Sequence, residues 1–306
     1  MSPAAPRRVL VVRLGALGDV VMSFPAFAAI RAHHPQAEIT LLTTRPYAAL
    51  AKAAPWFDHV AIDERPAWWN LPALLRLRAK LRGFDMTYDL QTSGRSSWYF
   101  HLAGRPAWSG IAHGCSHPQT GPARERMHTL ERQRDQLERA GIAAFPPPDL
   151  AFLTSRPLPP LPDRFALLVP GASAHRPGKR WPAERYGELA AVLAARGLTP
   201  VVTGAPNEAP LAATIRAACP AAIDLTDRSP LIDVFALAAR AAVTIGNDTG
   251  PTHIAAATGC PTIVLFSHES DPAMTAPRGP GGAWPTVIRV PVLADLPVAR
   301  VAAELP

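Results

Sequence analysis

Asp248, Thr249 and His253 stand close together in the segment 246–253, GNDTGPTH, which follows a short apolar β-branched run. The glycines predict a tight turn, and Pro251 suits the first turn of a helix, where its missing N–H costs nothing. The free N–H groups and the dipole of a helix N-terminus favour an anion. A purely structural turn needs the glycines but does not need an aspartate, a threonine and a histidine beside them. The pattern therefore favours a ligand site over a plain turn.

Lys179 and Arg180 lie in a loop that follows a second apolar run, residues 165–169. Two adjacent cations suit the oxygens of a phosphate group. A basic pair on a solvated surface is the alternative interpretation. Because the loop starts with Gly-Ala-Ser and ends with Trp-Pro, we expect it to be held in place, and we favour a phosphate site.

Asp19 comes after a third apolar run, residues 8–13, and a glycine-containing loop. It stands at the mouth of a predicted helix, where the helix dipole favours a carboxylate. Two interpretations remain open at this point. Asp19 either caps the helix or is a carboxylate held at the edge of a binding site for general-base catalysis.

Strands and helices alternate along the chain, which predicts βα units and parallel sheets, with ligands at the carboxyl ends of the strands. Strands are predicted over 8–13, 38–44, 59–62, 86–90, 107–111, 165–169, 199–203, 223–225, 242–245, 261–266 and 286–290. Helices are predicted over 20–34, 46–53, 71–82, 96–103, 129–140, 182–196, 207–218, 231–240, 252–258 and 293–305. The loop 112–122 contains His113 and His117, which we expect to face solvent rather than to form a metal pair.

The segment 145–163 contains seven prolines, so it is a poor helix and a poor central strand. It is typical of a semi-rigid linker between domains. The chain of 306 residues, 48% of them hydrophobic, is long enough for two domains. We therefore predict one domain over residues 1–155 and a second over residues 156–306.

The net charge of +7 lies almost entirely in the first of these domains. Residues 1–155 contain 18 Lys and Arg against 12 Asp and Glu, whereas residues 156–306 contain 13 against 12. An acidic partner of the first domain would suit this excess, such as a phosphorylated glycan, a lipid head group or nucleic acid. The alternative is that the arginines simply occupy solvated faces.

The three cysteines, Cys115, Cys219 and Cys260, form no CxxC pair and indicate neither a zinc knuckle nor a disulfide framework. Residues 1–15 contain no apolar segment as long as that of a signal peptide. No apolar run reaches the length of about 18 residues that a membrane span needs. These features predict a cytoplasmic protein with reduced thiols.

Three motifs resemble those of glycosyltransferase family 9, the ADP-heptose:lipopolysaccharide heptosyltransferases. They are VVRLGALGDVVMSFPAFAAIRAHHPQAEITLL at 11–42, PGASAHRPGKRWP at 170–182 and GNDTGPTHIAAATGCPTIVLF at 246–266. The resemblance covers nearly the whole chain. It implies an α/β chain with the GT-B fold, in which two Rossmann-like parallel-sheet domains face each other across a cleft. It also implies that the terminal helix, about residues 293–305, returns to the first domain.

The resemblance implies that heptose moves from ADP-heptose to the inner core of lipopolysaccharide with inversion, without a metal or another cofactor. Asp19 would be the general base, Lys179 would contact the donor phosphates and Asp248 would hold donor hydroxyls. Thr249, Gly250 and Pro251 would offer backbone amides to the pyrophosphate. The donor-binding residues implied in this way are Ser173, Lys179, Asp248, Thr249, Gly250, Pro251 and His253. The first domain would bind the acceptor, with Gly15, Gly18 and Arg95 as candidate residues, and the second would bind the donor.

The implied partners are a nucleotide-sugar donor, with ADP-heptose expected, and an acidic glycolipid acceptor. They include a peripheral contact with the cytoplasmic face of the inner membrane, and they exclude nucleic acid. The sequence does not identify residues that recognise adenine, so another nucleotide sugar remains an alternative donor.

Other classes of protein fit the sequence less well. A nucleotide-sugar 2-epimerase needs acid/base pairs for which no matching His/Glu set is found. A non-catalytic homologue is disfavoured because Asp19, Lys179 and Asp248 are all present. A nicotinamide-dependent oxidoreductase would need the GxGxxG fingerprint, which is missing, and no GxxxxGK[ST] phosphate loop occurs either. Nucleic-acid binding is disfavoured because the positive charge is dispersed and no reader motif occurs.

Overall fold

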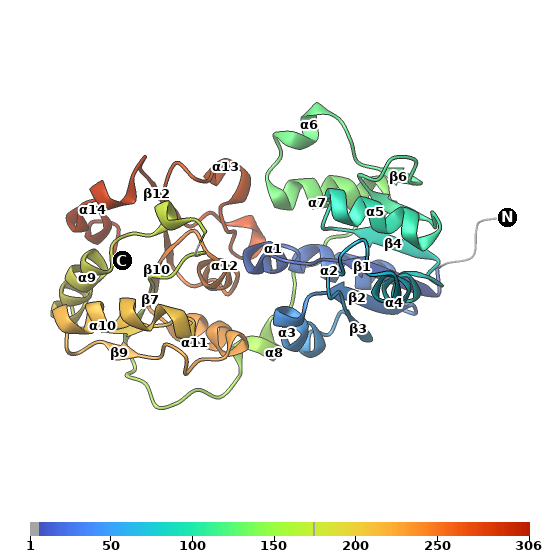
Figure 1. Cartoon of the computed structure of the whole chain (residues 1–306). Helices are drawn as coiled ribbons and strands as arrows, with labels where there is room; N and C mark the ends of the chain where they lie inside the picture. The colour runs from blue at the N-terminus through green and yellow to red at the C-terminus, as the bar shows by residue number, and fades with distance from the viewer. Residues whose placement is uncertain (1–5, 174) are drawn as a thin grey trace. The chain divides into compact units, whose positions relative to one another are not determined.

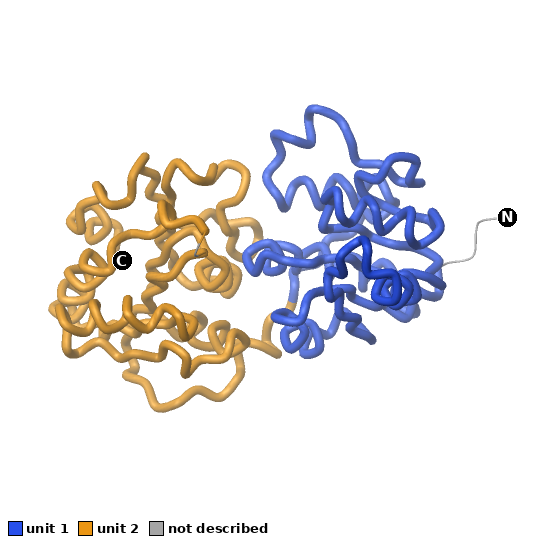
Figure 2. Tube along the Cα trace, in the orientation of Figure 1, with its two compact units in different colours: residues 1–148 blue, residues 149–306 orange. Residues whose placement is uncertain are grey.

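The computed structural model describes residues 6–173 and 175–306, so Ala174 of the 170–182 loop lies outside the described residues. The chain divides into two compact units, Met1–Pro148 and Asp149–Pro306 (Figures 1 and 2). The boundary lies inside the proline-rich segment, a few residues before the predicted position at 155. One short helix, α8 (Ala151–Thr154), occupies this predicted linker, and its Leu153 is buried.

Unit 1 contains a six-stranded sheet in the order β3-β2-β1-β4-β5-β6, in which every pairing is parallel. Its strands are β1 (Arg8–Val12), β2 (Glu38–Thr43), β3 (His59–Ile62), β4 (Met86–Asp89), β5 (Trp108–Gly110) and β6 (His117–Pro118). The predicted loop 112–122 thus contains the short edge strand β6. The chain lays down β1 to β3 in one direction and then returns to place β4 beside β1.

Helices cover both faces of this sheet because alternate residues of a buried strand point to opposite sides. Leu10 and Val12 of β1 pack in one core with α4 and α5, while Val9 and Val11 are equally buried on the other face. The helices are α1 (Leu17–Met22), α2 (Phe24–His33), α3 (Ala48–Ala53), α4 (Leu71–Leu81), α5 (Gly94–Ala103), α6 (Pro122–Glu125) and α7 (Thr129–Arg139).

The predicted helix 20–34 is two helices, α1 and α2, separated by Ser23. Pro25 lies two residues after this break. It has no N–H to donate to the carbonyl of Val21, and its ring would clash with that carbonyl in a continuous helix. The break leaves α1 as a separate short helix that carries Asp19 in its first turn.

Unit 2 repeats the architecture with the order β12-β11-β10-β7-β8-β9, again with parallel pairings. Its strands are β7 (Phe165–Val169), β8 (Thr199–Val202), β9 (Ile223–Asp224), β10 (Val243–Asn247), β11 (Thr262–Phe266) and β12 (Thr286–Arg289). Counted along the chain, both sheets have the order 3-2-1-4-5-6 of a Rossmann-like fold.

Both faces of the unit 2 sheet are buried as well. Leu168 of β7 packs on the side of α9 and α10, and Leu167 packs on the side of α11 and α12. The helices are α9 (Ala183–Ala195), α10 (Ala209–Ala218), α11 (Val234–Arg240), α12 (Gly250–Ala257), α13 (Pro272–Thr275) and α14 (Val298–Ala302). Fully buried apolar strands of this kind explain why the sequence reads as continuous hydrophobic runs.

The terminal helix differs from the expectation. The predicted helix 293–305 consists of a 3-10 turn, Leu293–Asp295, followed by α14. The helix α14 packs on α9, and Val301 is part of the unit 2 core. Apolar side chains of α14 are thus buried in its own unit, and the return of the terminal helix to the first domain stays a prediction.

Among the helices of the described residues, none combines the length and the hydropathy needed to cross a lipid bilayer.

Candidate functional site

The strand order places two adjacent strand ends in each unit where ligands bind to such sheets. In a doubly wound sheet the chain leaves the two central strands in opposite directions, which opens a crevice at their carboxyl ends. In unit 1 these strands are β1 and β4, and in unit 2 they are β7 and β10. Asp19 follows β1, whereas Lys179 follows β7 and Asp248 follows β10. The motifs that are dispersed in the sequence therefore lie at the crevice of their own unit. We call this place, where the strand order reverses, the switch point of the unit.

Asn247, the last residue of β10, ties the loops of unit 2 together. It is fully buried, and its Nδ2 donates to the carbonyl oxygens of Pro170 at 2.8 Å and Gly171 at 3.2 Å. Its Oδ1 accepts from the backbone N–H of Trp181 at 3.1 Å and from the hydroxyl of Tyr186 at 3.2 Å. The Asn247 side chain thus holds both ends of the 170–182 loop, which follows β7, against the end of β10. A loop held in place is what the sequence predicted.

Asp248 is the centre of a buried cluster of polar side chains. Lys179 Nζ donates to its Oδ2 at 2.5 Å, and their side chains are only 13% and 6% exposed. Ser270 Oγ donates to the same oxygen at 2.7 Å, and His253 Nε2 lies 3.3 Å from Oδ1. The structure therefore brings Lys179, Asp248 and His253 together and adds Ser270, which the sequence did not indicate.

Two opposing effects act on the pKa of Asp248. Burial alone would raise this pKa, because it removes the carboxylate from water. The hydrogen bonds from His253 and Lys179 and the positive charge of Lys179 outweigh burial and hold the pKa well below its usual range. Asp248 is consequently a carboxylate at neutral pH, and it keeps the ammonium of Lys179 at the entrance to α12.

The helix α12 begins at Gly250, with Thr249 as the extended residue before it. The N–H groups of a helix's first residues have no intrahelical acceptor. Pro251 occupies the second helical position. A proline has no N–H, so the expectation that Pro251 offers a backbone amide is wrong. Of the three residues expected to do so, only Thr249 and Gly250 have an N–H to offer.

Three polar atoms of these loops are buried and have no hydrogen-bond partner among the described residues. They are Thr249 Oγ1, His253 Nδ1 and Arg180 Nε. A buried polar group without a partner costs about 1–3 kcal/mol, and such groups in a native fold call for an explanation. Two of these atoms, Thr249 Oγ1 and His253 Nδ1, belong to the first turn of α12 and the residue before it, where a ligand would supply the missing partners.

Arg180 and Ser173, in the loop that follows β7, have hydrogen-bond partners outside the Asp248 cluster. Arg180 Nη2 donates to the carbonyl oxygen of Ala172 at 2.7 Å, so this arginine fastens its own loop. Ser173 is exposed, and its Oγ lies 3.0 Å from Nδ1 of His175. Contact of Ser173 with a phosphate therefore stays a prediction.

In unit 1, Asp19 both caps α1 and forms an ion pair. Its Oδ2 accepts from the backbone N–H of Ala16 at 3.1 Å, and its Oδ1 lies 3.3 Å from Nη2 of Arg13. The side chain of Asp19 is 39% exposed, whereas that of Arg13 is almost completely buried. The helix-capping role is thus observed, and the carboxylate is still accessible for the catalytic role.

Arg13 is held in place from several sides. Its Nη1 donates to the carbonyl oxygen of Leu90 at 2.5 Å, and its Nε donates to that of Asp19 at 3.2 Å. Burial lowers the pKa of Arg13, and the charges of Asp19 and Asp89 oppose this effect. A guanidinium with such contacts can orient the Asp19 carboxylate.

Asp89, at the end of β4, is a second carboxyl group at this switch point, and the sequence did not mark it as functional. It is fully buried, and burial raises its pKa to about 6. Its Oδ1 accepts from the backbone N–H groups of Gln91 and Thr92 at 3.1 and 3.0 Å. Because it is fully enclosed, Asp89 is not accessible to a ligand. Its negative charge stabilises the positive charge of Arg13.

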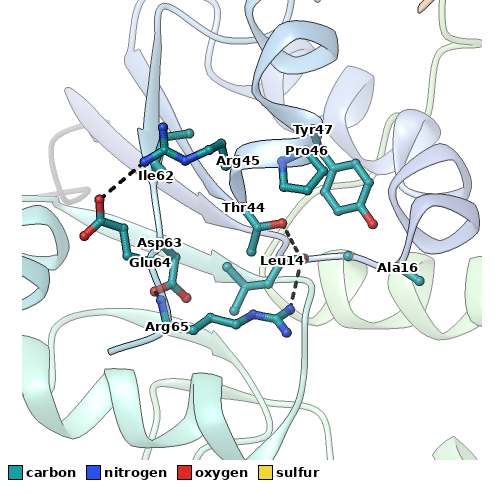
Figure 3. Close-up of a pocket in the computed structure, with 11 residues that line it drawn as sticks. Leu14, Ala16, Thr44, Arg45, Pro46, Tyr47, Ile62, Asp63, Glu64 and Arg65 are labelled. Atoms are coloured by element: carbon teal, nitrogen blue, oxygen red, sulfur yellow. Dashed lines mark hydrogen bonds and ion pairs between the residues drawn. The ribbon is translucent and has the colours of Figure 1, made fainter. Parts of the chain in front are cut away.

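A pocket of about 750 Å³ lies in unit 1 at the carboxyl ends of β1, β2 and β3 (Figure 3). Its lining residues are Leu14, Gly15, Ala16, Thr44, Arg45, Pro46, Tyr47, Ile62, Asp63, Glu64 and Arg65. The carbonyl oxygen of Leu14 accepts from Thr44 Oγ1 and Arg65 Nη2, both at 3.1 Å (Figure 3). Arg45 Nη2 lies 3.7 Å from Glu64 Oε1. The pocket thus presents two arginines, two carboxylates and the hydroxyl of Tyr47.

Of the predicted acceptor-side residues, Gly15 lines this pocket. Its φ of +118° favours glycine, and an added Cβ would lie 2.7 Å from Cε2 of Tyr47. Gly18 is buried inside α1 and does not line the pocket. Arg95 reaches it indirectly, because its Nη1 donates to the Tyr99 hydroxyl at 3.3 Å and that hydroxyl donates to Asp63 at 2.6 Å.

His117 forms a hydrogen bond of 2.9 Å with Ser116 through Nδ1. Within the part of the chain that the structure describes, no group of three or more His, Cys, Asp or Glu side chains is placed to share a metal ion.

Two Rossmann-like units, each with charged side chains at its switch point, have the architecture of the GT-B fold. The solved structure of Escherichia coli heptosyltransferase WaaC with ADP has this fold. It superposes with a TM-score of 0.77 at 21% identity, over 97% of this chain and 98% of that one. At this identity the likeness establishes the fold alone.

Residues 149–283 match the family described as glycosyltransferase family 9 (heptosyltransferase), and the family resemblance indicated by the sequence motifs is confirmed. The chain is 25% identical to lipopolysaccharide core heptosyltransferase OpsX of Haemophilus influenzae, over 89% of this chain and 82% of that protein. It is also 25% identical to lipopolysaccharide heptosyltransferase 1 of E. coli K12, over 89% and 91% of the two chains.

Sequence reasoning missed several residues that support the site. Asn247 was recognised only as part of a turn, although a buried amide at a strand end is a signal for loop fixation. Ser270 lies in a polar loop far from the motif, and no local pattern distinguishes it from its neighbours. Asp89 closes a predicted strand, which is where parallel sheets place their functional residues.

Proposed function

We propose that the chain is an inverting glycosyltransferase that moves heptose from ADP-heptose to the inner core of lipopolysaccharide or a related acidic glycan. The observation that carries this proposal is the cluster of Lys179, Asp248 and His253 at the start of α12. A nearly buried ammonium beside the N-terminus of a helix suits a pyrophosphate. The relatives described above are lipopolysaccharide heptosyltransferases, which supports the choice of donor and acceptor.

Unit 2 would hold the donor. Lys179 uses one N–H on Asp248 and has two left for phosphate oxygens. The backbone N–H groups of Thr249 and Gly250 would add to this positive potential. Asp248 accepts at most three hydrogen bonds from its protein partners and has about four acceptor sites, which leaves room for one donor hydroxyl.

Asp19 of unit 1 would act as the general base. The acceptor hydroxyl forms a bond to the anomeric carbon, and its proton passes to the Asp19 carboxylate. The bond between the anomeric carbon and the phosphate oxygen breaks, and its electron pair leaves with ADP. Lys179 and the amides at the start of α12 would stabilise the charge that develops on this leaving group, so we propose that no divalent metal is needed.

The acceptor would approach along the pocket of unit 1. Arg45 and Arg65 provide positive charge for an acidic glycan. Gly15 belongs to the same wall and allows the Tyr47 ring to approach the backbone closely. The predicted acceptor-side roles of Gly15 and Arg95 are therefore part of the proposal, whereas Gly18 would serve the packing of α1.

Calorimetric titration with ADP, UDP, GDP and NAD, in the presence of a chelator, tests the donor. A clear preference for ADP supports the proposal and leads to a transfer assay with ADP-heptose and truncated lipopolysaccharide. A preference for UDP or GDP would replace the donor by another nucleotide sugar. Absence of binding to all four would favour a non-catalytic homologue. Transfer that occurs without the chelator but is lost when the chelator is added would contradict metal independence.

A further inference from the structure

A patch of large apolar side chains is exposed on unit 1, at the connection between β3 and α4 and on the first turns of α4. Trp68 is 78% exposed, Trp69 72%, Leu71 63% and Leu75 55%. We call these four residues the tryptophan face. The two indole rings contact each other edge to face, with centroids 5.5 Å apart. Large apolar side chains that are exposed together in a short stretch of chain are typical of an interaction site.

The core of unit 1 does not need these side chains. The helix α4 buries Leu74, Leu77 and Leu81, and the last two belong to the core that also contains α5. Leu71 and Leu75 are four residues apart, so they form a second apolar stripe on a solvent-facing side of the helix. A helix whose packing is already complete thus carries an additional apolar surface.

Positive charge continues from the tryptophan face along the same helix. Arg78 follows Leu75 at a spacing of three residues and therefore extends the exposed stripe, and Arg76 is exposed beside it. The helix α4 and its C-cap contain Arg76, Arg78, Lys80 and Arg82 and no Asp or Glu. The surface consequently combines an apolar end with a basic end.

We propose that the tryptophan face and the arginines of α4 dock unit 1 onto the surface of an anionic phospholipid bilayer. Tryptophan is enriched at membrane interfaces, where its ring lies at the level of the head groups. Interfacial helices pair an apolar face with Lys and Arg that attract anionic lipids. A second copy of this chain fits less well, because a two-fold contact through this face would bring two basic surfaces together.

The experiment measures sedimentation of the full chain with vesicles. One set contains phosphatidylglycerol and phosphatidylethanolamine, and the other contains phosphatidylcholine alone. We expect binding to the anionic vesicles and at least tenfold weaker binding to the neutral ones, since each basic residue near an anionic surface contributes about fivefold. This surface association does not depend on which sugar the chain transfers.

Two variants divide the surface into its parts. Trp68→Ser combined with Trp69→Ser should lower partitioning at least tenfold on anionic vesicles, because the apolar contact is lost. Arg76→Gln combined with Arg78→Gln should lower it about thirtyfold on anionic vesicles and leave it unchanged on neutral ones. Trp284→Ser is the matched control, because it removes an exposed tryptophan from unit 2 and should not change binding.

All variants are compared by circular dichroism and by thermal unfolding, and we expect native curves because the substituted side chains are exposed. Absence of binding of the unaltered chain to either kind of vesicle would overturn the proposal. The proposal would also be overturned if Trp284→Ser lost as much binding to anionic vesicles as Trp68→Ser combined with Trp69→Ser. A lipid-free dimer that Trp68→Ser with Trp69→Ser dissociates, combined with no vesicle binding, would replace the bilayer by a second copy of the chain.

Discussion

Replacing Lys179 by methionine removes the positive charge from the Asp248 cluster while keeping a side chain of similar length. In the folded protein this charge lies 2.5 Å from Asp248 Oδ2, and only 13% of the lysine side chain is exposed. Because the pair is enclosed, the substitution affects two quantities, the free energy of unfolding and the affinity for ADP.

The loss of stability follows from the buried carboxylate that remains. Removing one partner of a buried ion pair costs about 3–5 kcal/mol. Asp248 keeps the hydroxyl of Ser270 at 2.7 Å and the ring of His253 at 3.3 Å, so we expect a value near the lower limit, about 3 kcal/mol. A double variant, Lys179→Met with Asp248→Asn, should recover most of this loss because no charge is left without a partner.

The loss of affinity has a separate origin. A charge-assisted hydrogen bond to a phosphate contributes about 1.5–3 kcal/mol, so Lys179→Met should weaken ADP binding about ten- to 150-fold. The double variant should not recover this affinity, since it still lacks the ammonium. Urea unfolding measures the first quantity, and calorimetric titration of ADP in chelator measures the second.

Lys52→Met serves as the control, because Lys52 is an exposed residue of α3 and should change neither quantity. An unchanged dissociation constant for ADP in Lys179→Met would refute the assignment of Lys179 to the phosphate site. If the double variant recovered both stability and affinity, the lysine would serve only to compensate the charge of Asp248.

Three further predictions concern other parts of the site. Asp19→Asn should lower the transfer rate about 10²- to 10⁴-fold, the range of general-base catalysis, with an unchanged dissociation constant for ADP by calorimetry. Asn247→Leu should lower the free energy of unfolding by about 4 kcal/mol in urea titration, because it leaves several buried polar groups without partners. Asp89 binds a proton in the folded protein up to a pKa of about 6, above its ordinary value of 3.8. The free energy of unfolding should therefore fall by about 3 kcal/mol as the pH rises from about 4 to about 6, and Asp89→Asn should lack this decline.

Each of these predictions has a result that contradicts it. Asp163→Asn changes an exposed aspartate, and equal transfer rates in this variant and Asp19→Asn would exclude Asp19 as the base. A midpoint in urea that Asn247→Leu leaves unchanged would show that the loops are held without this amide. Identical pH profiles of stability for Asp89→Asn and the unaltered chain would mean that Asp89 does not titrate in this range.

The sequence determined the class of fold. Apolar runs such as 165–169 and 262–266 are buried on both faces, so their continuous hydrophobicity follows directly from parallel sheets covered by helices. The same pattern placed Asp19, Lys179 and Asp248 after strands, at the edge where such sheets bind ligands. Local chemistry was sufficient for these inferences because strand, turn and helix signals act over a few residues.

Only the tertiary structure decided which side chains meet and which surfaces remain free. Ser270 reaches Asp248 across 22 residues of chain, and Asn247 reaches Pro170 across 77. The terminal helix α14 joins the unit 2 core because Val301 finds its apolar neighbours there. The sequence likewise predicts α4 as a helix, but the exposure of Leu71 and Leu75 depends on which side of this helix packs on the core. Contacts between distant segments and the burial of each face are set by packing, and no local pattern encodes them.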